Sequence, residues 1–187
     1  MTGDRPLRAD AARNRARVLA AAQEAFAAEG IAVPLDEIAR RAEVGAGTVY
    51  RHFPTKEALF EAVILDRLTR FVDYARKLAA AEDPEAGFFE FLHLLVTGAA
   101  SSKDLADALA GANLANAELI VAAKRDMTLA GEALLRRAQQ AGVVRGDIGI
   151  TEVMALFTGT TVALQQQPAD EALRERVFAV LRDGLRQ

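Results

Sequence analysis

Apolar side chains recur with the spacing of amphipathic helices along nearly the whole chain. A first helix is predicted over residues 10–29, and Gly30 is placed to end it in a left-handed turn. No stretch alternates apolar and polar residues as a half-buried strand would, and no internal repeat is visible. The pattern therefore predicts an all-α protein of about nine helices.

Residues 35–53 predict two short helices joined by a tight break. Pro34 opens the first of them, whose buried stripe is expected to be Leu35, Ile38, Ala39 and Ala42. The second begins near Ala46 and points Val49 and Phe53 toward the interior. Two short helices with a turn of this length form a helix-turn-helix, here over about residues 35–54, whose second helix enters the major groove of DNA.

The remainder of the chain predicts helices throughout. Their expected ranges are 56–81, 88–99, 102–112, 115–141, 151–166 and 168–185. Thr55 and Thr151 are placed as N-caps, and Gly142 is placed to end the longest segment of the second half. The clearest boundary after the first long helix is the sequence Glu82-Asp83-Pro84.

The amino-acid composition argues against an enzyme, a metalloprotein and a membrane protein. The chain has 187 residues, of which 51% are apolar, and this is enough to bury a sizeable core. It contains no cysteine and only two histidines, and it shows neither a glycine-rich phosphate loop nor paired metal ligands. We therefore expect no catalytic site, metal or cofactor. With no secretion signal and no apolar run long enough to span a bilayer, we expect a cytoplasmic protein that does not enter the membrane.

The charge distribution is uneven although the net charge is −3. Residues 1–60 hold nine Lys or Arg against eight Asp or Glu, whereas residues 61–187 hold fourteen against eighteen. The most basic segment is 1–17, with five arginines and two aspartates. A positive end on an acidic body is typical of a protein that meets phosphate with one face, although a short basic tail also occurs without that role.

The second helix of the helix-turn-helix carries the residues expected to contact DNA. Ala46 and Gly47 have almost no side chain, so the backbone can approach DNA closely there. Polar groups follow on the face opposite the buried one, supplied by Thr48, Arg51 and His52, with Tyr50 between them. Lys56 follows at the start of the next helix, where the helix dipole also attracts phosphate.

Basic residues of the first helix are further candidates for phosphate binding. We expect Arg13 and Arg17 to contact the DNA backbone, whereas Arg5 and Arg8 are better explained as part of a disordered, solubilising tail. The alternative for the whole polar surface is a solvated helix face, since helix-turn-helix shapes also occur in proteins that never bind DNA.

Three sequence blocks of residues 13–64 resemble the DNA-binding domain of the TetR family of transcriptional regulators. They are RARVLAAAQEAFAAEG, LDEIARRA and VGAGTVYRHFPTKEALFEAVI. The resemblance implies an all-helical homodimer with a basic arm at 1–12, a DNA-binding domain at 13–72 and an effector-binding and dimerisation domain at 73–187. It also implies DNA contacts by Ala46, Gly47, Thr48, Tyr50, Arg51, His52 and Lys56.

Two positions depart from the family pattern. Glu43 stands in the turn where the family usually has glycine. A non-glycine residue with positive φ costs roughly 1–2 kcal/mol, so a different turn geometry is one expectation here. Pro34-Leu35 replaces the hydroxyl residues that often cap the second helix and hold phosphate, so that contact is not expected.

The second half predicts an apolar effector site and a dimer interface. The resemblance places the effector among the middle helices, and the candidates for its contacts are Phe89, His93 and Asn116. Isolated polar residues in apolar segments are more often satisfied structural groups. The apolar stripes of the last two helices are Val153, Leu156, Phe157 and Leu164, and Leu173, Val177, Val180 and Leu181. They predict a four-helix dimer interface, although an intramolecular core would show the same stripes.

The favoured hypothesis is a repressor that leaves a palindromic double-stranded operator when a small, apolar effector binds. An enzyme is poorly supported, because the chain lacks the groups named above. The remaining alternative is a helical interaction or ligand-binding module without specific DNA binding, for which Glu43 and the acidic net charge are the only support.

Overall fold

The computed structural model describes residues 4–100, 117–167 and 170–187. In these ranges it contains eight α-helices and, as its only β-structure, one isolated bridge between Val144 and Arg186. The helices are α1 Asp4–Glu29, α2 Leu35–Arg41, α3 Ala46–His52, α4 Lys56–Ala79, α5 Pro84–Ala100, α7 Ala117–Gln140, α8 Ile150–Gln165 and α9 Glu171–Leu185. The all-α prediction is confirmed, while the helix predicted over 102–112 lies outside the described residues.

The described residues fall into two compact units. The first contains the chain through Arg67 together with 117–120, and the second contains the chain from Leu68 to Ala100 and from Val121 onward. The helices α4 and α7 therefore each contribute residues to both units.

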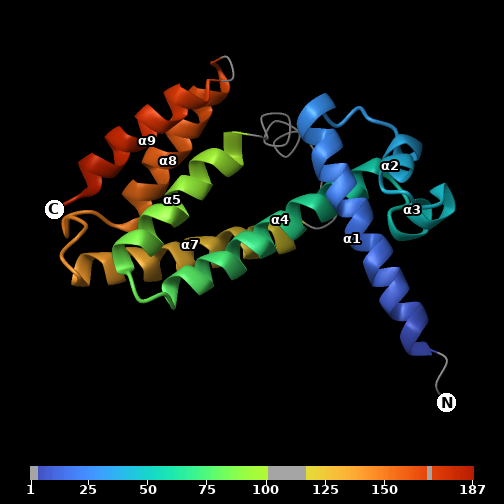
Figure 1. Ribbon diagram of the computed structural model, residues 1–187, viewed down its shortest axis with the longest axis horizontal. Helices are drawn as coiled ribbons and strands as arrows, with labels where there is room; N and C mark the ends of the chain where they lie inside the picture. The colour runs from blue at the N-terminus through green and yellow to red at the C-terminus, as the bar shows by residue number, and fades with distance from the viewer. Residues whose placement is uncertain (1–3, 101–116, 168–169) are drawn as a thin grey trace. The chain divides into compact units, whose positions relative to one another are not determined.

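In the first unit, α1, α2 and α3 pack against one another, as Figure 1 shows. Their contacts bury apolar residues at helical spacing, among them Val18, Ala22, Phe26, Ile38 and Val49. The start of α4 joins the same core, because the ring of Phe60 meets the ring of Phe26 edge-on with 5.9 Å between centroids. This core fixes the helix-turn-helix predicted from the sequence.

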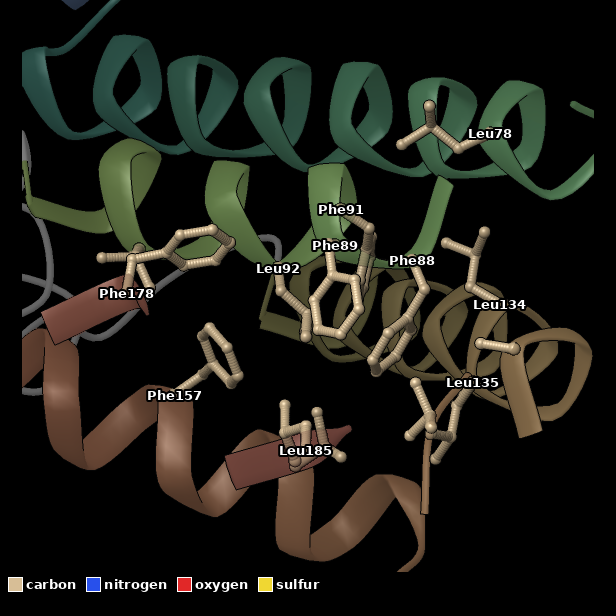
Figure 2. Close-up of a cluster of buried hydrophobic side chains, with 14 of the residues drawn as sticks. Leu78, Phe88, Phe89, Phe91, Leu92, Leu134, Leu135, Phe157, Phe178 and Leu185 are labelled. Atoms are coloured by element: carbon tan, nitrogen blue, oxygen red, sulfur yellow. The ribbon is translucent and has the colours of Figure 1, made fainter. Parts of the chain in front are cut away.

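In the second unit, α5 packs on both α8 and α9. Figure 2 shows the phenylalanines of α5 pointing into a shared core with Phe157 of α8 and Phe178 of α9. Leucines from α4 and α7 close the other side of this core. The residues most fully buried there include Phe88, Phe91 and Leu92.

Helices α1, α5 and α8 start at residues other than those predicted, and local interactions explain two of these starts. The predicted start of α1 at residue 10 is wrong, because the helix begins at Asp4 and Pro6 lies in its first turn, where proline is tolerated. Helix α5 starts four residues early, since Asp83 Oδ1 accepts hydrogen bonds from the amides of Glu85 and Ala86 at 2.9 and 3.0 Å. Thr151 is not a cap: α8 starts after Gly149, whose N–H donates to Glu152 Oε2 at 2.8 Å.

Other predicted ends are confirmed. Gly30 and Gly142 both have left-handed φ, of 78° and 73°, and each ends its helix as predicted. Thr55 Oγ1 accepts from the amide of Ala58 at 3.1 Å at the start of α4. Helix α9, by contrast, begins at Glu171 and not at the predicted residue 168, and Asp170 caps it by accepting from the amide of Leu173 at 3.0 Å.

In the second unit, polar contacts tie down the C-terminal end of α4 and the C-terminus of the chain. Arg137 of α7 donates to the carbonyl of Ala79 and, at 2.7 Å, to the carbonyl of Ala81, so it satisfies acceptors at the C-terminal end of α4. Near the C-terminus, the Arg186 guanidinium lies 2.5 Å from Glu85 Oε1 and above the ring of Phe89. Both ends are thus held to the helical core.

Gly131 allows α7 to approach α5 closely, and its replacement tests the packing. A Cβ atom at this position would lie 2.9 Å from Cζ of the buried Phe91 and 3.1 Å from Cδ1 of Ile150. We expect Gly131→Ala to lower the free energy of unfolding by about 1–3 kcal/mol through overpacking, despite the better helix propensity of alanine. Thermal unfolding at fixed protomer concentration measures this change. Gly184→Ala in α9 is the matched control, since its Cβ would meet no atom within 4 Å, and equal stability of both variants would contradict the prediction.

Candidate nucleic-acid interface

The turn between α2 and α3 contains a residue in the left-handed backbone conformation, and this residue is a glutamate. Glu43 has a φ of 50°. Its amide donates to the carbonyl of Arg40 at 3.1 Å, and the Val44 amide donates to the carbonyl of Ala39 at 3.0 Å. This hydrogen-bond pattern is the Schellman motif, which satisfies the last carbonyls of α2. The expectation of a different turn geometry is therefore wrong: the glutamate adopts the conformation that favours glycine.

Two buried residues orient α3. Val49 is fully buried and Phe53, at the C-terminal end of the helix, is 3% exposed. The Arg15 guanidinium of α1 lies over the Phe53 ring, with Cζ 5.5 Å from its centroid, and this arrangement is a cation–π contact. The sequence did not single out Arg15, because only the folded chain brings it to the recognition helix.

The predicted DNA-facing residues lie on the outer part of α3. Tyr50 is 47% exposed, Ala46, Gly47 and Arg51 are exposed, and Thr48 and His52 are half-buried. The N-cap is Gly45, and no side chain caps the helix there. The first turn of α3 thus presents backbone and small side chains outward, and the later turn presents an aromatic and a basic group.

Two cations beside this face carry charge that no carboxylate compensates. In the described part of the chain, no carboxylate lies within ion-pair distance of Arg51 or Lys56. Lys56 Nζ instead donates to the neutral carbonyl of Ala32, at 3.0 Å. That hydrogen bond orients the ammonium group and leaves its positive charge available to phosphate.

The basic residues of α1 have different surroundings. Arg13 pairs with Asp10 one turn earlier in the same helix. Arg17 Nη2 lies 2.7 Å from Oε2 of Glu43 in the turn. Both predicted phosphate ligands are therefore held by carboxylates, and their contact with DNA stays a prediction.

The two arginines of α2 are also neutralised. Glu37 accepts hydrogen bonds from Arg40 and Arg41 at distances of 2.7 to 2.8 Å, and Arg41 also pairs with Glu29 at 2.5 Å. The bonds from Arg40, and then those from Arg41, lower the pKa of Glu37 to about 2. The carboxylate is therefore charged at neutral pH, and α2 presents no net positive surface.

Two candidates for effector contacts lie in the second unit, and only one of them is buried. Phe89 is 7% exposed within the core cluster. His93 Nε2 lies 3.0 Å from Glu175 Oε1 of α9, and its ring meets Phe178 edge-on at 4.9 Å. Both side chains therefore join α5 to its neighbours. Asn116 lies outside the described residues.

The described residues contain no candidate metal site and no helix suited to spanning a membrane. No group of three or more histidine, cysteine, aspartate or glutamate side chains there could hold a metal ion. None of the helices described is both long and apolar enough to cross a bilayer.

Family models match both halves of the chain. The model described as bacterial regulatory proteins of the tetR family matches residues 18–63. The model described as the C-terminal domain of SbtR-like transcriptional regulators matches residues 83–187. Among curated proteins, the HTH-type transcriptional regulator UidR of Escherichia coli K12 is 28% identical, and the alignment covers 96% of this chain and 93% of UidR.

Solved structures show the same similarity. A TetR regulatory protein from Mycobacterium vanbaalenii is 49% identical with a TM-score of 0.80, covering 97% of this chain and all of the other. The TetR regulator SCO0520 from Streptomyces coelicolor is 33% identical with a TM-score of 0.80, covering 92% and 98% of the two chains.

The strain at Glu43 can be measured. We expect Glu43→Gly to raise the free energy of unfolding by about 1 kcal/mol, because glycine adopts positive φ without a steric cost. Loss of the exposed pair with Arg17 offsets a few tenths of a kcal/mol of this gain. Urea denaturation compares this variant with Glu43→Ala, which loses the ion pair but keeps the unfavourable backbone. A glycine variant no more stable than the alanine variant would show that the turn is unstrained.

Proposed function

The chain belongs to the TetR family of DNA-binding transcriptional regulators, and we propose that it is a repressor that binds a palindromic operator as a homodimer and leaves it when a small effector binds. The observation that carries the proposal is the outer face of α3, with the uncompensated cations Arg51 and Lys56 beside it. A helix of this kind enters the major groove, and the flanking cations contact phosphate.

The residues divide by chemistry. Small residues at the start of α3 let its backbone approach base edges. Tyr50 and Arg51 supply donors and an apolar ring that reach further into the groove. Lys56 and His52 lie where phosphate contacts fix the register of the protein on the duplex. Arg13 and Arg17 are phosphate ligands that must first leave their carboxylate partners.

Exposed apolar side chains on α8 and α9 support the homodimer. Val153, Phe157 and Leu164 are buried in the intramolecular core, whereas Leu156 and Val162 of the same helix are 48% and 50% exposed. On α9, Val180 is 73% exposed, whereas Leu173, Val177 and Leu181 pack against the core. The stripes thus serve both purposes that the sequence left open, and the exposed members are our proposed interface. A two-fold dimer places two α3 helices on half-sites about 34 Å apart.

We place the effector site in the second unit, within the proposed domain at 73–187. The match of residues 83–187 to a regulator C-terminal domain supports this division, and the phenylalanine-rich interior of that unit suits an apolar molecule. Emptying an operator requires only a roughly 100-fold loss of DNA affinity, a coupling of about 2.7 kcal/mol. A regulator of transcription acts where the chromosome lies, so we place it in the cytoplasm.

DNA binding tests the assignment of Lys56. We expect Lys56→Gln to weaken binding to duplex DNA of any sequence and to reduce the slope of log K against log salt by about one. Fluorescence anisotropy over a salt series measures both quantities, with a mixed-sequence duplex and with a duplex selected by the protein from a random pool. The control is Lys77→Gln, which removes an exposed lysine of the second unit. Failure of the unmodified protein to bind any duplex at low salt would refute the proposed function.

The oligomeric state tests the interface. We expect Val180→Arg to shift the protein from dimer to monomer, because a charged side chain would be buried between two apolar surfaces. Size-exclusion chromatography with light scattering gives the mass in solution. Val121→Arg is the control, since Val121 of α7 is similarly exposed, at 66%. If the control dissociates and the α9 variant remains dimeric, the interface lies elsewhere.

A further inference from the structure

Glu43 is the only non-glycine residue with positive φ in the described part of the chain. The Schellman motif around it uses backbone groups alone, so the turn itself requires no carboxylate. A glycine at this position would form the same motif without steric cost. What the glutamate adds is a negative charge in the turn before the recognition helix.

That charge lies close to the expected DNA surface and holds a cation. Glu43 precedes Ala46 by three residues, which limits their Cα separation to about 11 Å. Its carboxylate pairs with Arg17 of α1 at 2.7 Å, and the two side chains are 83% and 46% exposed. The N-terminal residues of a recognition helix contact base edges, so this pair lies beside the groove that α3 enters.

We propose that Glu43 holds Arg17 away from DNA phosphate and so weakens the sequence-independent part of DNA binding. The inference rests on the proposed function. Contacts to phosphate supply affinity for every duplex and carry no sequence information directly. Removing one such contact therefore lowers binding to unrelated DNA while the base contacts of α3 are retained. Glu43 is in this sense a specificity-determining residue that touches no base.

The neighbouring charges act in the same direction. Arg40 and Arg41 of α2 are also occupied by carboxylates, so the uncompensated charge beside α3 comes from Arg15, Arg51 and Lys56. An exposed ion pair is worth only about 0.2–1 kcal/mol. A phosphate placed well by a docked operator can therefore displace Glu43, whereas a loosely bound duplex gains little from doing so.

The test removes the charge without changing the backbone. Glu43→Gln keeps the side-chain size and the left-handed residue. At about 0.1 M salt we expect this variant to bind a mixed-sequence duplex about two to five times more tightly, with a salt slope steeper by about one. The gain for the selected duplex should be smaller, so the ratio of specific to non-specific affinity falls.

Further variants assign the effect to Arg17. Arg17→Gln alone should change the affinity for the mixed-sequence duplex little, because Glu43 already neutralises the arginine when the duplex is loosely bound. The double variant Glu43→Gln/Arg17→Gln should lose the gain of the single one. Glu132→Gln is the matched control: it breaks an exposed pair with Arg136 of 2.8 Å in the second unit and should leave DNA binding unchanged. Circular dichroism verifies that each variant is folded.

The outcomes separate the inference from the proposed function. If the unmodified protein binds DNA and Glu43→Gln shows the same affinity and slope, the inference alone is overturned. It is also overturned if the double variant keeps the full gain, because the carboxylate then acts by repelling DNA and not by holding Arg17. If no variant binds any duplex at low salt, the proposed function falls and the inference with it.

Discussion

A recognition helix of seven residues is too short to be stable in isolation, since helices below about 12 residues are marginal in water. Its conformation depends on burial of Val49 and Phe53 in the core that α1, α2 and the start of α4 provide. Every group on the outer face, from Gly47 to His52, is positioned by those two anchors. A loss of packing in this core would therefore abolish DNA recognition without touching a residue that contacts DNA.

Carboxylates neutralise many of the positively charged side chains of the first unit. The arginines of α2, and Arg13 and Arg17 of α1, are each held by a carboxylate. The positive charge that remains near α3 comes from Arg51 and Lys56, and from Arg15 over the Phe53 ring. A chain with a net charge of −3 can thus present a local cationic surface to DNA, and the net charge says little about it.

Local chemistry explains which features could be predicted from the sequence. Glycine at a helix end and a hydroxyl at a helix start act within a few residues, so the roles of Gly142 and Thr55 could be predicted. The start of α1 was misplaced because proline in a first turn is compatible with a longer helix. The pair of Arg17 and Glu43 joins residues 26 apart, and no local pattern reports which arginine reaches the turn.

The long α4 helix gives the fold a mechanical property. Its 24 residues run without a break from Lys56 to Ala79, and Arg137 holds the carbonyls at its far end. A helix of this length measures about 36 Å, so a tilt of about 5° around one end displaces the other by about 3 Å. That displacement is close to the roughly 3.4 Å of helix axis that separates successive charges of one DNA strand. A small change in the direction of this helix at one end is therefore enlarged, at the other end, to about the axial spacing of the charges on a DNA strand.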